Sequence, residues 1–132
     1  MRTKPLILVV DDEDSFLEIF SAKLSASGFD VALARDEQEA LVQSEKLTPD
    51  LVLMDIRMPG ASGTDAALAI KQNPKTKDTK IAFLTSLEQP WPAVHSNSNK
   101  NVAVALGMED FIQKTDNLDA IVEKVRGILG RQ

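Results

Sequence analysis

Short apolar runs alternate with amphipathic segments along almost the whole chain, and this alternation restricts the fold more than any other feature of the sequence. The runs are Leu6–Val10, Val31–Ala34, Leu51–Met54, Ile81–Leu84 and Asp110–Gln113. The first, third and fourth runs are continuously apolar, which is typical of strands that are buried on both faces of a parallel sheet. The runs therefore predict strands, the central ones fully buried.

The segments that follow the first two runs have the spacing of helices. Apolar residues recur from Phe16 to Leu24 on one helical face, and Gly28 is placed to end that helix at its C-terminus. Asp36 and Glu39 predict a capping box in front of a second helix, which carries apolar residues as far as Leu47.

Two later segments are also predicted to be helical. One carries Ala66–Ile70 and ends before Pro74. The other has the clearest apolar stripe of the chain, within residues 118–129, with Asp116 or Asn117 as its cap. Strict alternation of strand and helix predicts an α/β fold with a doubly wound parallel sheet and right-handed crossovers.

The composition limits the classes of protein that fit. A length of 132 residues is that of one domain. The 15 basic and 20 acidic residues leave a net charge of −5, which argues against direct binding to nucleic acid or to an anionic membrane. The absence of cysteine excludes thiolate metal sites, and the lone His95 excludes a polyhistidine site. The apolar run Leu6–Val10 is too short for a secretory signal, so we expect a cytoplasmic protein.

Polar residues stand where four of the predicted strands end. Asp11 and Asp12 follow the first strand, Asp55 the third, Thr85 the fourth and Lys114 the fifth. Ligands of open α/β sheets bind at the carboxyl ends of the strands, so we expect these side chains to share one rim. Converging carboxylates need a cation, and their hard oxygen atoms suit Mg²⁺. A carboxylate beside Mg²⁺ and an ammonium group can accept a phosphoryl group as an acyl phosphate.

Each of these residues also has a simpler interpretation when it is taken alone. The acidic residues at positions 11–14 could complement the dipole of the helix that follows. Asp55 could be an ordinary turn residue ahead of a Met-Pro-Gly turn, and Lys114 or Thr85 alone would be unremarkable. Their combination at one rim favours the phosphoryl site.

Four segments together resemble a known family. They are Val9–Glu13, Leu51–Gly60, Thr85-Ser86 and Phe111–Lys114, and they look like the receiver domain of two-component response regulators. The resemblance extends over about residues 5–129. It implies a flavodoxin-like fold, with five parallel strands in the order 2-1-3-4-5 and helices on both faces. It also implies a single receiver domain over residues 1–132, with no output domain in this chain.

The resemblance implies a role for each residue that matches the family's motifs. Asp55 matches the aspartate that accepts a phosphoryl group from a histidine kinase. Asp12 matches a direct Mg²⁺ ligand and Asp11 a ligand that acts largely through water, while Asp55 and the backbone carbonyl of Arg57 complete the protein ligands. Lys114 matches the lysine that pairs with the phosphoryl group.

The same resemblance implies a conformational switch rather than a conventional enzyme. Thr85, Ser86 and Phe111 match the switch residues, and the surface of helix four, strand five and helix five is expected to change on phosphorylation. Turnover is limited to the chain's own phosphotransfer and slow autodephosphorylation. The implied partners are a sensor histidine kinase or phosphotransfer protein and an unidentified downstream protein, with a homodimer as one form of the phosphorylated chain.

The sequence departs from the family in two places. Thr115 stands where the family usually has proline after the lysine, and the stretch 86–101, which contains Trp91, is longer than usual and rich in turn formers. The helix expected over residues 99–106 is weakly indicated. These departures favour one alternative, a receiver-like binding module that switches little or not at all on phosphorylation. A Mg²⁺-dependent phosphohydrolase is a weaker alternative, because Arg57 stands where a second aspartate would act as general acid.

Overall fold

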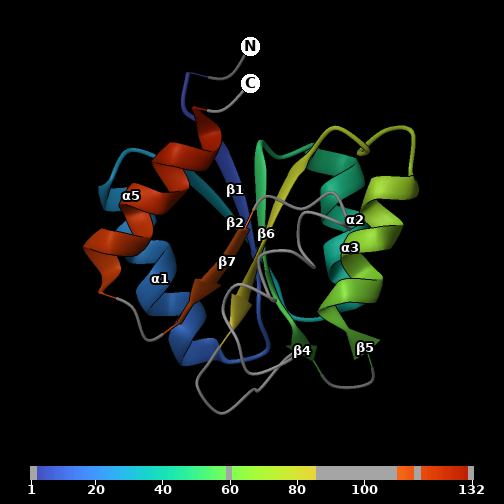
Figure 1. The fold of residues 1–132 in the computed structure, drawn as a ribbon, viewed down its shortest axis with the longest axis horizontal. Helices are drawn as coiled ribbons and strands as arrows, with labels where there is room; N and C mark the ends of the chain where they lie inside the picture. Colours follow the sequence, from blue (N-terminus) through green and yellow to red (C-terminus); the bar gives the residue numbers. More distant parts are fainter. Residues whose placement is uncertain (1–2, 59–60, 86–109, 115–116, 131–132) are drawn as a thin grey trace.

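A parallel sheet of five strands forms the centre of the molecule, in the order β2-β1-β3-β6-β7 (Figure 1). The computed structural model describes residues 3–58, 61–85, 110–114 and 117–130. The strands are β1 (Leu6–Val10), β2 (Asp30–Ala34), β3 (Leu51–Asp55), β6 (Lys80–Thr85) and β7 (Asp110–Gln113). All five predicted strands and the predicted order 2-1-3-4-5 are confirmed.

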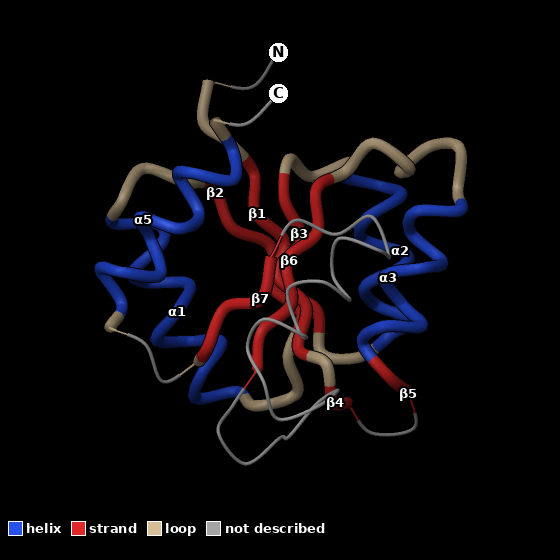
Figure 2. Tube along the Cα trace, viewed as in Figure 1, coloured by secondary structure: helices blue, strands red, loops and turns tan. Residues whose placement is uncertain are grey.

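Helices cover both faces of this sheet (Figure 2). One face carries α1 (Asp14–Ala26) and α5 (Leu118–Leu129), and the other carries α2 (Glu37–Leu47) and α3 (Gly63–Gln72). Successive strand residues point to opposite faces. Ile7 and Val9 thus belong to the core beneath α1 and α5, whereas Leu8 and Val10 belong to the core beneath α2 and α3. The doubly wound α/β fold is confirmed.

The burial of the strands follows their place in the sheet. Residues 7–10 of β1, 51–54 of β3 and 81–84 of β6 are fully buried. β2 lies at one edge, and most of its residues are only partly buried or exposed. This explains why three runs are continuously apolar, since only strands in the interior of the sheet are covered on both faces.

Gly28 ends α1 as predicted. Its φ of +99° lies in the left-handed region, which residues with a Cβ atom rarely adopt. The backbone N–H of Gly28 donates to the carbonyl of Ser25 (3.2 Å), and that of Phe29 donates to the carbonyl of Leu24 (3.1 Å). This pair of bonds is the Schellman motif, which satisfies the last carbonyl groups of the helix and turns the chain into β2.

The predicted N-terminal caps are in place. The side chain of Asp36 accepts a hydrogen bond from the backbone N–H of Glu39 at the start of α2 (2.8 Å). Asn117, one of the two candidate caps of α5, occupies the cap position, and its side chain accepts a hydrogen bond from the backbone N–H of Asp119 (2.7 Å). Each cap satisfies a helix N–H group that has no partner within the helix.

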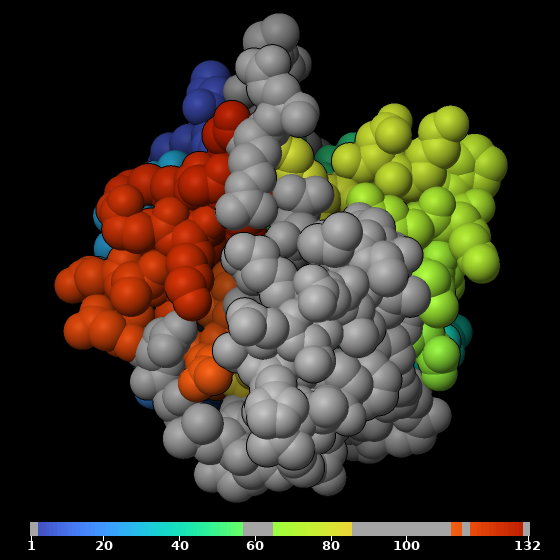
Figure 3. Space-filling model, viewed as in Figure 1, coloured from blue at the N-terminus to red at the C-terminus, as the bar shows by residue number. Residues whose placement is uncertain are grey.

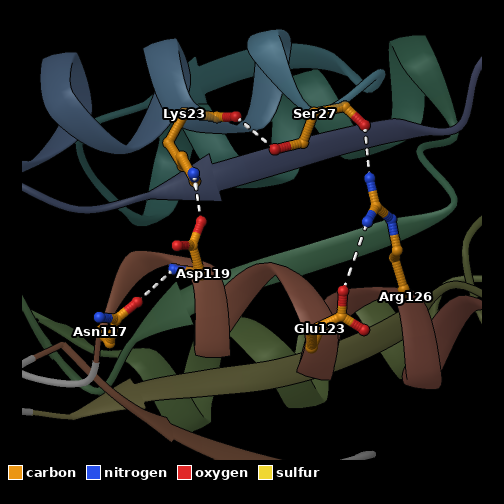
Figure 4. A network of polar contacts seen from close by, with 6 residues as sticks. All are labelled: Lys23, Ser27, Asn117, Asp119, Glu123 and Arg126. Carbon is orange, nitrogen blue, oxygen red and sulfur yellow. Dashed lines mark hydrogen bonds and ion pairs between the residues drawn. The ribbon is translucent and has the colours of Figure 1, made fainter.

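Charged side chains join α1 to α5 along their exposed sides (Figure 4). Lys23 of α1 forms an ion pair with Asp119 of α5. Arg126 of α5 donates to the backbone carbonyl of Ser27 (2.8 Å) and lies 3.5 Å from Glu123. We call these five residues the α1–α5 network, and they bridge two helices that already share an apolar core.

A small antiparallel ribbon follows β3. It consists of β4 (Arg57–Met58) and β5 (Ala61–Ser62), with Arg57 opposite Ser62. The sequence predicts only a turn here, and residues 59–60 lie outside the described residues. The irregular stretch 86–101 and the helix expected over 99–106 also lie outside them.

The end of α5 and the carboxyl ends of the strands lie at opposite ends of the sheet (Figure 1). The beginning of β1 and the end of α5 lie at one end, and the strands point their carboxyl ends toward the other (Figure 1). In the space-filling view, α5 and α3 form opposite flanks of the molecule (Figure 3). The functional residues predicted from the sequence should therefore lie at the end opposite the terminus of α5.

Candidate functional site

The predicted site residues occupy the carboxyl ends of adjacent strands. Asp11 directly follows β1, Asp55 is the last residue of β3, Thr85 is the last residue of β6, and Lys114 directly follows β7. Asp55 is paired in register with Leu84, and the backbone N–H of Lys114 donates to the carbonyl of Thr85 (2.6 Å). The order of the strands thus brings residues that are far apart in sequence to one rim, as predicted.

Three carboxylates converge at this rim. Asp11, Asp12 and Asp55 each place an oxygen atom within 4.8 Å of the others. Asp11 is fully buried and Asp55 is 1% exposed, whereas Asp12 is exposed to solvent. The side chain of Asp11 also accepts a hydrogen bond from the backbone N–H of Glu13 (2.9 Å), which holds it at the entrance to α1. Two of the three carboxylates, those of Asp11 and Asp55, therefore lie where little water can screen their charge.

The ammonium group of Lys114 lies among these carboxylates. Its Nζ atom is 2.6 Å from Oδ2 of Asp11, 2.7 Å from Oε1 of Glu13 and 3.5 Å from Oδ2 of Asp55. The lysine side chain is only 7% exposed. Nζ also lies 4.7 Å from the centre of the Phe16 ring, at a distance typical of a cation–π contact. We call Asp11, Asp12, Asp55 and Lys114 the strand-end cluster.

Burial and charge shift the pKa values of two members of this cluster. Burial raises the pKa of the Asp11 carboxyl above its usual range, although the close ion pair with Lys114 partly opposes this shift. Burial alone would lower the pKa of Lys114, but the ion pair with Asp11, the hydrogen bond to Glu13 and the nearby charge of Asp55 raise it above its ordinary value. Lys114 therefore stays an ammonium ion at neutral pH.

The strand-end cluster fits a magnesium ion. Mg²⁺ prefers hard oxygen ligands and keeps several of its water molecules, so it needs few protein carboxylates. The cluster supplies such oxygens, and the exposed position of Asp12 gives a hydrated ion access to them. The single ammonium of Lys114 does not balance the three carboxylates, so a further cation would relieve their repulsion.

The remaining predicted site residues are described only in part. Thr85 is nearly buried at the end of β6. Arg57 begins β4, two positions after Asp55, and Phe111 of β7 pairs in register with Phe83 of β6. The side chains of Arg57 and Phe111 lie outside what is described. Ser86 lies outside the described residues. The ligand role of the Arg57 carbonyl and the switch roles of Thr85, Ser86 and Phe111 stay predictions.

The structure adds two side chains that sequence reasoning did not assign to the site. Glu13 is expected from its position only to complement the dipole of α1, and Phe16 only to belong to the apolar face of that helix. Phe16 does pack against the apolar core, as expected, but both side chains also contact the ammonium group of Lys114. No signal in the sequence pairs Glu13 with a lysine that is 101 positions away.

Comparison with known families finds one family whose sequence model matches nearly the whole chain. The sequence model of the family described as "Response regulator receiver domain" matches residues 7–126. This range includes the whole strand-end cluster. Within the part of the chain that the structure describes, no helix has the length and apolar character needed to cross a membrane.

Individual relatives extend this similarity. The alkaline phosphatase synthesis transcriptional regulatory protein PhoP of Bacillus subtilis is 30% identical over 125 residues, which are 95% of this chain and 48% of that protein. The DNA-binding response regulator MtrA of Mycolicibacterium smegmatis is 33% identical over 129 residues, or 95% of this chain and 50% of that protein. The chain thus spans about half the length of these relatives.

Solved structures of similar size share the fold. The chemotaxis response regulator CheY4 of Vibrio cholerae superimposes with a TM-score of 0.81 at 26% identity. The alignment covers 96% of this chain and 99% of that one. The similarity therefore includes the complete sheet and the helices on both of its faces.

Proposed function

The chain belongs to the response regulator receiver domain family of two-component systems, and on this basis we propose that Asp55 accepts a phosphoryl group from a histidine kinase or a phosphotransfer protein. The observation that carries the proposal is the convergence of Asp11, Asp12 and Lys114 on the side chain of Asp55. This arrangement favours an active receiver over a receiver-like binding module, because a module that only binds a partner does not need a buried ammonium beside a buried carboxylate.

The proposed transfer is a displacement at phosphorus. A carboxylate oxygen of Asp55 forms a new O–P bond while the P–N bond to the donor histidine breaks, and the electron pair stays on the imidazole nitrogen. Lys114, with Nζ 3.5 Å from Oδ2 of Asp55, is placed to offset charge on the phosphoryl oxygens. Asp11, Asp12, Asp55 and the Arg57 carbonyl would hold Mg²⁺, which when bound offsets further charge on those oxygens.

The proposed output is a change of surface rather than the release of a product. Thr85 and Lys114 are joined by a short backbone hydrogen bond between the ends of β6 and β7. A phosphoryl group that draws the Thr85 hydroxyl and Lys114 toward itself would therefore act on both strands at once. The segment after β6, including Ser86, together with Phe111 of β7 and the surface of α5, would shift between two arrangements.

The proposed partners follow from the same mechanism. The phosphoryl donor is a histidine kinase or phosphotransfer protein, and the switched surface would bind a downstream protein or a second copy of the chain. The net charge of −5 disfavours direct contact of this chain with nucleic acid. DNA binding is part of the name of MtrA, whose length is about twice what this chain covers.

Phosphorylation by a small donor tests the proposal directly. Acetyl phosphate with Mg²⁺ should add one phosphoryl group to the wild-type chain, as measured by intact mass, and Asp55→Asn should remain at its starting mass. Asp119→Asn removes an exposed carboxylate from α5 and should be phosphorylated like the wild type. If the wild type takes up no phosphoryl group, or if Asp55→Asn takes up as much, the proposed function is wrong.

A further inference from the structure

We propose that Glu13 is a positioning residue that holds Lys114 in the unphosphorylated chain and competes with the phosphoryl group for its ammonium. This inference rests on the proposed phosphorylation of Asp55. It assigns to Glu13 a role separate from the ligand and acceptor roles of the three aspartates.

The distances define the competition. Nζ of Lys114 lies 2.7 Å from Oε1 of Glu13 but 3.5 Å from Oδ2 of Asp55. The ammonium is therefore held more closely by Glu13 than by the residue that would carry the phosphoryl group. An ammonium group has three N–H donors, and Asp11, Glu13 and Asp55 already surround this one.

Local backbone structure keeps Glu13 in reach of Lys114. Its N–H donates to Oδ1 of Asp11 (2.9 Å), and its carbonyl accepts the first helical hydrogen bond of α1 from Leu17 (3.0 Å). Phe16, one turn into the helix, places its ring 4.7 Å from Nζ. The start of α1 thus contacts the ammonium through a carboxylate and an aromatic face.

Glu13 is the contact that phosphorylation can release most easily. Its side chain is 61% exposed, so water can solvate the carboxylate once Lys114 leaves. Asp11 is fully buried and has no such replacement. When a phosphoryl group on Asp55 attracts the ammonium, the Glu13 contact should therefore weaken first, and its strength becomes part of the free energy of switching.

Beryllofluoride, which mimics a phosphoryl group on a carboxylate, provides the test. In the presence of Mg²⁺, Glu13→Gln should lower the dissociation constant of beryllofluoride by about twofold to fivefold, the range expected for a partly exposed charge pair. Asp14→Asn is the matched control, because Asp14 is also exposed, lies in the same turn and pairs with Arg35 at 2.7 Å rather than with Lys114. It should bind beryllofluoride like the wild type.

Two further measurements separate positioning from a general effect of charge. In a Lys114→Met background, Glu13→Gln should no longer change the affinity, because the competing ammonium is gone. In protein without metal or beryllofluoride, the side-chain NMR signals of Lys114 should shift in Glu13→Gln and stay in place in Asp14→Asn.

The outcomes are distinguishable. Equal effects of Glu13→Gln and Asp14→Asn, weaker binding in Glu13→Gln, or unchanged Lys114 signals would each overturn the role of Glu13. A wild-type chain that neither binds beryllofluoride nor takes up a phosphoryl group would instead refute the proposed function itself, and the competition with it.

Discussion

The strand-end cluster and the α1–α5 network contain the same chemical pair in two surroundings. Lys114 and Asp11 form an ion pair in which the side chains are 7% and 0% exposed. Lys23 and Asp119 form an ion pair in which they are 32% and 80% exposed. Both pairs join residues that are far apart in sequence. The exposed fractions of their side chains show that they differ in access to water.

This difference decides what each pair can do. Water screens the Lys23–Asp119 pair, and exposed pairs of this kind contribute little to stability. Around Asp11 and Lys114 water is largely excluded. Burial there raises the pKa of Asp11, and the neighbouring carboxylates raise the pKa of Lys114, so this buried pair would respond strongly to an added cation or phosphoryl group. The exposed network bridges two helices, whereas the buried cluster can act as a chemical site.

Replacing Lys114 or Lys23, each in a separate variant, should give the largest difference in the free energy of unfolding. Lys114→Met keeps an unbranched side chain but leaves buried carboxylates without their cation, so we expect the free energy of unfolding in Mg²⁺-free buffer at neutral pH to fall by about 3 kcal/mol. Lys23→Met should lower it by less than about 1 kcal/mol. Urea denaturation of both variants measures the difference.

The pH dependence of Lys114→Met should follow from Asp11. Because burial raises the pKa of Asp11, its ionised form destabilises the fold above that pKa once Lys114 is absent. Protonation as the pH falls should relieve this, so the deficit of Lys114→Met relative to the wild type should shrink in acid. If Lys114→Met and Lys23→Met lose the same free energy of unfolding at neutral pH, the proposed difference between the buried and the exposed ion pair is wrong.

Magnesium should stabilise the strand-end cluster and leave the α1–α5 network unaffected. At a concentration ten times its dissociation constant, a ligand that binds only the folded state adds about 1.4 kcal/mol to the free energy of unfolding. We expect this gain for the wild type and for Asp119→Asn, and a much smaller gain for Asp12→Asn. Thermal unfolding with and without Mg²⁺ measures this gain in stability. A full gain in Asp12→Asn would argue against Asp12 as a Mg²⁺ ligand.

The sequence predicts the strand-end cluster for a reason that does not apply to the network. Asp11, Asp12, Asp55 and Lys114 each stand at or just after the end of a strand, and the carboxyl ends of parallel strands share one edge. Local pattern and sheet topology are therefore enough to bring them together. The family resemblance then adds the roles, which geometry alone does not assign.

Contacts that depend on side-chain conformation and helix packing could not be predicted in this way. The contact of Glu13 with Lys114 requires the rotamers of two long side chains, and the contact of Lys23 with Asp119 requires the rotation of α1 relative to α5. Neither is encoded in hydrophobic period or spacing. The β4–β5 ribbon is not predictable from the sequence either, because its paired segments are too short for any periodic signal.

Ser44 tests whether burial of a polar group alone indicates a site. Its hydroxyl on α2 is buried and has no hydrogen-bond partner in the part of the chain that the structure describes. Ser44→Ala should raise the free energy of unfolding by about 1 kcal/mol, because it removes the cost of an unsatisfied hydroxyl and favours helix. Ser25→Ala, at an exposed position of α1, should give only the smaller helical gain. A loss of stability in Ser44→Ala would show that the hydroxyl has a partner.

The smallest expected effect is the coupling within the α1–α5 network. In a double-mutant cycle with Lys23→Met and Asp119→Asn, we expect an interaction energy of about 0.5 kcal/mol in dilute buffer. The cycle removes the separate effect of Asp119 on the helix dipole of α5, because that effect appears in both arms. In 1 M salt the coupling should nearly vanish, since exposed charges are then screened within about 3 Å. A coupling of several kcal/mol that persists in salt would mean that the Lys23–Asp119 pair is shielded from water, as the Lys114–Asp11 pair is. Exposure to water could then no longer explain why one pair forms a chemical site and the other only bridges two helices.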